Sequence, residues 1–281
     1  MLLMPRARTI VRLLVIAIAG YAAVVLVGCG AYRRVLFPAP HNVPPIPPGY
    51  GELLSTKTSD GVTAQGLYFP PPDDDAPVVI FFHGNGETIT YNLDRSEDLR
   101  SLGFGVLLAE YRGYGTTSGS GSPSEAGLYA DAEAEILAVE ARGIKKERIA
   151  IWGFSLGTGV ASEMAARGHA CALVLEAPFT SIVDMGWHYA PFLPVSLIVT
   201  DKFDTLSKAP KISVPAIVLH GDADQVVPFR MGELVARTLP HARFIGVHGG
   251  KHTDLLELDK DEIYGAAADT FNSACRAPVP K

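Results

Sequence analysis

Short continuous apolar runs, which do not alternate with polar residues, recur along the chain between positions 77 and 249. Six such runs follow one another: PVVIFFH, FGVLLAEY, RIAIWGF, CALVLEA, PAIVLHG and ARFIGVHG. Continuous apolar runs are typical of strands buried on both faces, as in a parallel sheet with helices on each side. Two earlier stretches, ELLSTKT and VTAQGLYF, are joined at Asp60-Gly61 and predict an antiparallel strand pair.

The segments between these runs predict helices because of their length and apolar spacing. They are residues 88–101, 123–142, 156–167, 227–238 and 254–272. This alternation predicts an α/β fold, with a mostly parallel central sheet, an antiparallel N-terminal pair and helices on both faces. Residues 178–210 interrupt the alternation and predict a small helical insertion. Its aromatic residues either pack on the sheet or form a lid over an apolar pocket.

The first 29 residues form a separate apolar segment. Three arginines precede the apolar run 13–28, as in a signal sequence or a membrane anchor. The run ends in the stretch LVGC, which resembles the lipobox of bacterial lipoproteins with Cys29 as the lipidated residue. An uncleaved transmembrane helix is the alternative. Both interpretations place the rest of the chain outside the membrane as an exported domain.

A proline-rich linker, residues 30–49, is expected between this anchor and a folded domain at residues 50–275. The chain has 281 residues, which suits one large α/β domain, and a net charge of -6. The lack of a basic run excludes nucleic acid as the expected partner. The three cysteines show neither zinc-site spacing nor a disulfide framework, so Cys171 is expected to be an ordinary core residue.

A serine between two glycines follows one expected strand, in the stretch RIAIWGFSLGTGVA. Ser155 ends this strand and begins a helix, which is the context of a nucleophile elbow. Gly153 and Gly157 permit a turn sharp enough to expose the hydroxyl. The backbone N–H of Leu156, at the helix N-terminus, can stabilise an oxyanion. A glycine-rich turn without catalytic function is the alternative.

A serine hydroxyl needs a base, and the base needs an orienting acid. His252 lies in the loop after the last expected strand and is the favoured base, with His248 as its rival. Asp224 is the favoured acid because it lies further into its loop than Asp222, although it could instead cap the following helix. Asp222 is expected to accept hydrogen bonds from its own turn.

Two loops at the same predicted sheet edge complete the site. In FFHGNGET we expect the backbone N–H of Asn85 to be a second oxyanion donor. The alternative is a plain turn in which His83 packs the loop. The glycine-rich loop after the next strand is expected to be held by internal hydrogen bonds of Arg112, and its alternative is a wall of the substrate pocket.

Five stretches together resemble the α/β-hydrolase superfamily over about residues 50–270: FFHGNG, AEYRGYGTTSG, GFSLGTGVA, LHGDADQVVP and GGKHTDLLE. They are similar to the membrane-associated serine hydrolases of the depalmitoylase and serine-aminopeptidase-like branch. The resemblance implies Ser155 as nucleophile, Asp224 as acid and His252 as base. It also implies Asn85 and Leu156 as oxyanion donors. The chain departs from the commoner GGH pattern because a lysine stands between the two glycines and the histidine.

These features predict an exported, membrane-anchored serine hydrolase that cleaves an ester or thioester through an acyl-enzyme. The alternatives are an amidase or peptidase with the same triad, and a non-catalytic binding module on the same scaffold. The expected substrate is a small-molecule or lipid-like acyl ester. The membrane is contacted through the N-terminus, and neither a metal nor an organic cofactor is implied.

Overall fold

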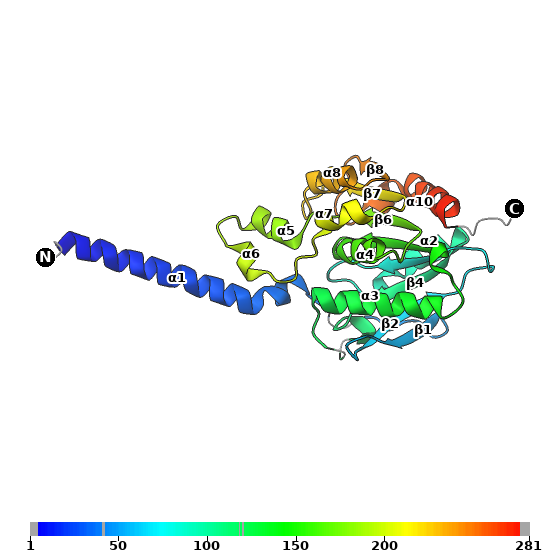
Figure 1. Cartoon of the computed structure of the whole chain (residues 1–281), viewed down its shortest axis with the longest axis horizontal. Coiled ribbons are helices and arrows are strands. Elements are labelled where there is room, and N and C mark those ends of the chain that lie inside the picture. The colour runs from blue at the N-terminus through cyan, green and yellow to red at the C-terminus, as the bar shows by residue number, and fades with distance from the viewer. Residues whose placement is uncertain (1–4, 41–42, 118, 120, 276–281) are drawn as a thin grey trace.

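An eight-stranded sheet forms the centre of the domain in the computed structural model, which describes residues 5–40, 43–117, 119 and 121–275 (Figure 1). The strand order is β1-β2-β4-β3-β5-β6-β7-β8. The strands are β1 (Glu52–Lys57), β2 (Thr63–Phe69), β3 (Val78–Phe82), β4 (Gly105–Glu110), β5 (Ile149–Phe154), β6 (Ala172–Glu176), β7 (Ala216–Gly221) and β8 (Ala242–Val247). β2 pairs antiparallel with β1 and with β4, whereas all other pairs are parallel. The predicted architecture is confirmed.

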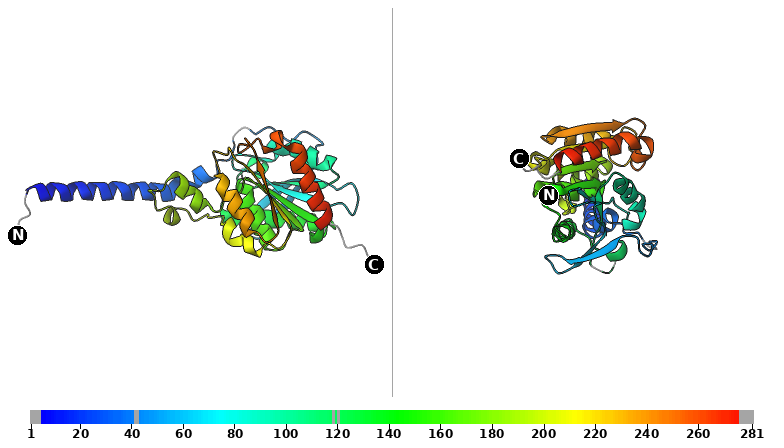
Figure 2. Two further views of the ribbon diagram at one scale, coloured as in Figure 1. Left: turned by 90° about the horizontal axis from the view of Figure 1, so that it is seen from above. Right: turned by 90° about the vertical axis from the view of Figure 1, so that its right-hand side faces the viewer.

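Helices cover both faces of this sheet (Figure 2). One face packs against α3 (Glu125–Glu140), α4 (Leu156–Ala166) and α8 (Phe229–Thr238). The other packs against α2 (Leu93–Ser101), α9 (Leu255–Leu258) and α10 (Lys260–Ala274). Short 3-10 turns complete the connections: η1 (Ile89–Asn92), η2 (Gly115–Thr117) and η3 (Lys146–Arg148). The five central parallel strands are buried, as their continuous apolar runs require.

The insertion between β6 and β7 is helical, as expected. It contains α5 (Ile182–Tyr189), α6 (Val195–Ile198), α7 (Thr205–Lys208) and η4 (Ala209–Lys211). Its aromatic residues divide into two groups. Phe203 is fully buried and packs edge-on against Tyr129 of α3, whereas Trp187, Tyr189 and Phe192 are more than half exposed. Phe179 is also buried, so two of the five aromatic residues of the insertion pack onto the core and three are exposed.

The N-terminal helix α1 (Pro5–Leu36) projects from the domain beside the insertion (Figure 1). Its segment Arg8–Leu36 is long and apolar enough to cross a membrane, and its apolar side chains are exposed. The helix continues past Cys29 into the segment expected to be a linker. Phe37, directly after the helix, is buried against Phe203 with ring centroids 6.2 Å apart. Phe37, upstream of position 50, therefore packs against the insertion.

The prediction that the cysteines form no disulfide is wrong. Cys171, just before β6, is bonded to Cys275, just after α10, with Cα atoms 5.2 Å apart. The two residues are 104 positions apart in the sequence, and only the packing of α10 on the back of the sheet brings them together. No local spacing could signal such a pair, because disulfide geometry depends on distance in space.

Candidate active site

Ser155 occupies a strained turn between β5 and α4. Its φ of 48° and ψ of -115° lie outside the regions that residues with a side chain readily adopt, at a cost of about 1–3 kcal/mol. The two flanking glycines make the turn possible. A Cβ at Gly153 would collide with the carbonyl oxygen of Gly157, and a Cβ at Gly157 would collide with that of Phe82. The turn therefore depends on both glycines, and the serine side chain stands at the carboxyl edge of the sheet.

The structure brings Ser155, His252 and Asp224 together from three separate loops. His252 Nε2 lies 2.9 Å from the hydroxyl oxygen of Ser155, and its Nδ1 lies 2.8 Å from Oδ2 of Asp224. With its proton on Nδ1, neutral His252 donates to the carboxylate and can accept the serine proton at Nε2. The histidine ring packs beside Phe154 with centroids 5.3 Å apart. The contacts thus join the three residues in the order Ser155, His252, Asp224.

Backbone N–H groups and a second histidine hold the carboxylate of Asp224 in place. Its Oδ1 accepts the backbone N–H groups of Val226 and Val227, at 2.7 and 2.9 Å. Its side chain is fully buried, and Nε2 of His220 lies 3.3 Å from Oδ2. Burial alone would raise the pKa of Asp224, but hydrogen bonds from His220 and His252 outweigh it and lower the pKa well below the usual range. The carboxylate is therefore ionised at neutral pH.

Asp224 does not cap the helix that follows it. Its carboxylate instead stabilises a turn within its own loop. The N-cap position of α8 is Pro228, and the bonds of Asp224 go to residues two and three positions further along the loop. One carboxylate oxygen thus shapes the loop while the other faces His252. The two functions are compatible because a carboxylate offers two oxygens with several lone pairs.

Asp222 and His248 form a second pair at the same edge. His248 Nδ1 lies 2.8 Å from Oδ2 of Asp222, and the N–H of Gly249 donates to Oδ1 at 2.7 Å. The carboxylate of Asp222 therefore bonds to the loop after β8. The expectation that it accepts hydrogen bonds from its own turn is wrong. The side chain of His248 is 99% exposed. No contact joins this pair to Ser155 among the described residues.

Asn85 lies just after β3, beside the turn that carries Ser155. Gly157 of that turn approaches the carbonyl oxygens of Phe82 and His83 closely, so the two loops are adjacent. The hydroxyl of Tyr114 donates to the side-chain oxygen of Asn85 at 3.0 Å. Leu156 is the first residue of α4, where a backbone N–H has no intrahelical partner. Leu156 thus follows Ser155 directly, and the loop that carries Asn85 lies beside the same turn.

His83 is buried below this loop. Its Nε2 lies 2.9 Å from Oε1 of Glu110, the last residue of β4, and its Nδ1 lies 2.8 Å from the carbonyl oxygen of Gly84. Oε2 of Glu110 accepts the N–H of Ile89 at 3.2 Å. Burial lowers the pKa of His83, but the hydrogen bond and the charge of Glu110 raise it overall. The pair ties the candidate oxyanion loop to the sheet.

Sequence reasoning missed three supporting residues. His220 at the end of β7 shields Asp224, Glu87 accepts the N–H of Gly84 at 2.9 Å, and Tyr114 holds Asn85. Their only sequence signal is a position close to a strand end. Arg112 behaves as expected, since its guanidinium donates to Asp131 and Asp60.

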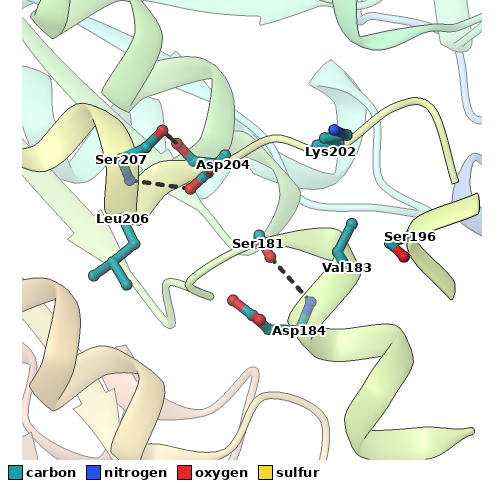
Figure 3. A pocket seen from close by; sticks show the side chains of 8 residues that line it. All are labelled: Ser181, Val183, Asp184, Ser196, Lys202, Asp204, Leu206 and Ser207. Carbon is teal, nitrogen blue, oxygen red and sulfur yellow. Dashed lines mark hydrogen bonds between the residues drawn. The ribbon is translucent and has the colours of Figure 1, made fainter. Parts of the chain in front are cut away.

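Two hollows border the insertion. The first, of about 470 Å³, is lined by polar and apolar side chains: Ser181, Val183, Asp184, Ser196, Lys202, Asp204, Leu206 and Ser207 (Figure 3). The second, of about 590 Å³, lies between α5 and α8 and includes Trp187 and Arg237. Ser155 and His252 line neither hollow. Among the described residues no group of three His, Cys, Asp or Glu side chains could hold a metal ion.

Comparison with known proteins gives a family match and many similarities, among them the following three. Residues 73–203 match the family described as serine aminopeptidase, S33. An uncharacterized protein of Mycobacterium tuberculosis is 32% identical over 262 residues, which cover 90% of this chain and 92% of that protein. The human alpha/beta hydrolase domain-containing protein 17B is 31% identical over 217 residues, covering 76% of this chain and 71% of that protein. The esterase Pf2001 of Pyrococcus furiosus has a similar fold, with a TM-score of 0.71 at 18% identity, over 84% of this chain and 99% of the esterase.

Proposed function

Because the chain belongs to the α/β-hydrolase superfamily, we propose that it is a serine hydrolase that cleaves a carboxylic ester or thioester through an acyl-enzyme. One observation carries the proposal: the unbroken series of contacts from Ser155 through His252 to Asp224, at a strained turn. The structural relative from Pyrococcus furiosus is an esterase, which supports an ester substrate.

Each group has a distinct task in the proposed mechanism. His252 Nε2 takes the proton of Ser155 as the hydroxyl oxygen attacks the carbonyl carbon. The backbone N–H groups of Asn85 and Leu156 stabilise the negative charge of the tetrahedral intermediate. Protonated His252, stabilised by ionised Asp224, then donates its proton to the leaving group. Water, activated by the same histidine, releases the acyl group and restores the serine.

A second candidate function is an amidase or peptidase, which the match of residues 73–203 to the serine aminopeptidase family favours. The same triad cuts both kinds of bond. A panel of p-nitrophenyl esters of graded chain length, assayed beside aminoacyl p-nitroanilides, separates the two. Turnover confined to the anilides would refute the ester assignment. A folded protein that turns over neither and does not react with a fluorophosphonate would be a binding module.

We also propose that α1 anchors the protein to a membrane, with the catalytic domain exported. The apolar helix supports the anchor, and the Cys171–Cys275 disulfide supports an oxidising compartment outside the cytoplasm. The hydroxyl of Tyr21 donates to the carbonyl of Phe192, a contact that exists only if the helix is not cleaved before Cys29. We therefore favour the uncleaved helix. Mass spectrometry of the mature protein tests it, since a lipidated Cys29 as first residue would contradict it.

A further inference from the structure

One stripe of α1 lies along the insertion, as Figure 1 and the left view of Figure 2 both show. Tyr21 bonds to the carbonyl of Phe192, and Gly28 lies against Ile198. Tyr32 and Arg33 bond to Asp201, with 2.7 Å between Nε of Arg33 and Oδ2. These contacts fix the register of the insertion along the helix. The contacted residues Tyr21 and Tyr32 are 11 positions apart, so at 1.5 Å per residue the segment 192–201 extends about 16.5 Å along α1.

Ten consecutive residues of the insertion beside α1 have no charged side chain. Residues 190–199 read APFLPVSLIV, and we call this segment the apolar hairpin. Phe192 and Leu197 are 71% and 77% exposed, although both are large and apolar. The first charged residue after this segment is Asp201, which bonds to Arg33. Exposed apolar side chains that adjoin a candidate membrane helix indicate a surface that contacts lipid.

Most of the backbone N–H groups of the apolar hairpin are paired within the protein. A polar backbone group in hydrocarbon must be paired within the protein, because lipid offers it no partner. Two of the ten residues are prolines, which have no N–H, and six others donate their N–H to a carbonyl of the insertion: Ala190, Leu193, Val195, Leu197, Ile198 and Val199. The carbonyl of Phe192 accepts the hydroxyl of Tyr21 at 3.1 Å. A water-exposed loop needs no such pairing.

From this combination we infer that the apolar hairpin docks into the lipid bilayer alongside α1, in the leaflet nearest the catalytic domain. The inference rests on the proposed membrane anchor. Arg33 and Arg34 then lie at the headgroup level, and Phe192 and Leu197 lie in the acyl-chain region. The arginines at positions 12 and 33 are 21 residues apart, which gives about 30 Å of helix, the thickness of the hydrocarbon core.

The apolar hairpin is connected to the candidate active site. The hydroxyl of Tyr189, at the end of α5, donates to the carbonyls of Gln225 and Val226 at 3.0 and 2.6 Å. Those residues follow Asp224 directly in the loop that holds it. A lipid-bound hairpin therefore places the catalytic edge of the sheet close to the membrane surface. This position favours substrates that are esters with an acyl chain in the bilayer.

Tryptophan fluorescence tests the docking on the full chain. The chain has two tryptophans, of which Trp152 is fully buried and Trp187 is exposed. In a Trp187→Phe background, Phe192→Trp reports on the hairpin, and Leu137→Trp, on the half-exposed face of α3, is the matched control. Each variant is reconstituted into phosphatidylcholine vesicles with and without bromine on the acyl chains. We expect emission from position 192 to fall by about half or more, as for a side chain among the acyl chains, and emission from position 137 to stay unchanged.

Equal emission with and without bromine at position 192 would overturn the inference. So would equal quenching at both positions, because lipid contact would then not be specific to the hairpin. A blue shift at position 192 that depends on protein concentration, without quenching, would assign the surface to a second copy of the chain and would also overturn it.

Activity gives a second, independent measurement. In the full chain we expect Phe192→Ser combined with Leu197→Ser to leave the hydrolysis of a soluble short-chain p-nitrophenyl ester unchanged. Hydrolysis of a long-chain ester embedded in vesicles should fall about tenfold or more, because two apolar side chains no longer enter the bilayer. Equal effects on both esters would contradict the inference. If the proposed hydrolase function itself is wrong, the wild type cleaves neither ester, while the fluorescence result stands unaffected.

Discussion

Two histidine–aspartate pairs lie at the same edge of the sheet, and their local geometry is nearly identical. His252 with Asp224 and His248 with Asp222 both have 2.8 Å between Nδ1 and the carboxylate oxygen. Their surroundings differ. The side chains of the first pair are 13% and 0% exposed, and those of the second are 99% and 40% exposed. Only the first pair has a serine hydroxyl at the other ring nitrogen.

The difference shows why a hydrogen bond between these residue types is not itself a catalytic signal. Hydrogen bonds from His248 and from the N–H of Gly249 lower the pKa of Asp222, yet water surrounds this pair and screens its charges. The pKa of Asp224 is lowered although its burial acts in the opposite direction. A buried carboxylate that stays ionised can stabilise a positive charge on its histidine far better than an exposed one can.

The largest expected effect comes from removing the serine that distinguishes the two pairs. Ser155→Ala should lower kcat by about 10⁶-fold, as loss of the nucleophile does in a serine protease. It should also abolish stoichiometric labelling by a fluorophosphonate, measured by intact-protein mass spectrometry. Labelling that persists in this variant would move the nucleophile elsewhere. Loss of a single hydroxyl at a partly exposed site should leave the fold intact, which circular dichroism checks.

Asp224→Asn should have the next largest effect. The amide cannot stabilise a protonated His252, so kcat should fall by about 10⁴-fold, as it does when the triad aspartate of a serine protease is replaced by asparagine, while the protein remains folded. Hydrolysis of one p-nitrophenyl ester, measured together with the melting temperature, tests this. A loss of activity that follows unfolding alone would assign Asp224 to loop structure instead of to the triad.

The buried pair of His252 and Asp224 alone should determine how kcat/KM changes with pH. Asp224 and Asp222 both have a lowered pKa, so both carboxylates are ionised between pH 5 and 8, and the acid limb belongs to a histidine. As the pH is lowered from about 8 to about 5, kcat/KM should fall, because a protonated His252 cannot take the proton of Ser155. The stability that these carboxylates provide is present above the pKa of an unfolded aspartate, about 4, and is lost as the pH falls further. The acid limb is therefore measurable on folded protein.

His248→Ala should preserve this acid limb. A flat profile in the wild type between pH 5 and 8, or a limb that disappears in His248→Ala, would contradict the assignment of His252 as base.

The smallest expected effect is that of Asp222→Asn. Its carboxylate is exposed and does not contact Ser155 or His252, so activity should stay within about tenfold of wild type. The measured ratio of the effects of Asp224→Asn and Asp222→Asn is the sharpest test of the comparison, because the two variants make the same chemical change two residues apart. The reverse ranking would transfer the acid role to Asp222.

The sequence alone predicts the sheet, its antiparallel start, the helices and the insertion. These follow from continuous apolar runs and from turn residues, which act over a few positions. Ser155 is also predictable, because the flanking glycines and the change from strand to helix are local features. The positions of His252 and Asp224 at the same edge follow from the parallel direction of their strands, since parallel strands end at one edge of the sheet.

Tertiary structure alone decides the contacts between distant segments. The Cys171–Cys275 disulfide, the bond of Asp222 to the loop after β8 and the stripe of α1 beside the apolar hairpin each join positions at least 25 residues apart. No short-range pattern encodes such pairs, because they depend on how layers pack after the elements have formed. The same reason explains why Phe203 is buried while Phe192, in the same insertion, is exposed. The sequence predicts the same environment for both, an aromatic residue in a helical segment. In the folded protein Phe203 packs against the core, whereas Phe192 lies beside α1 and stays exposed.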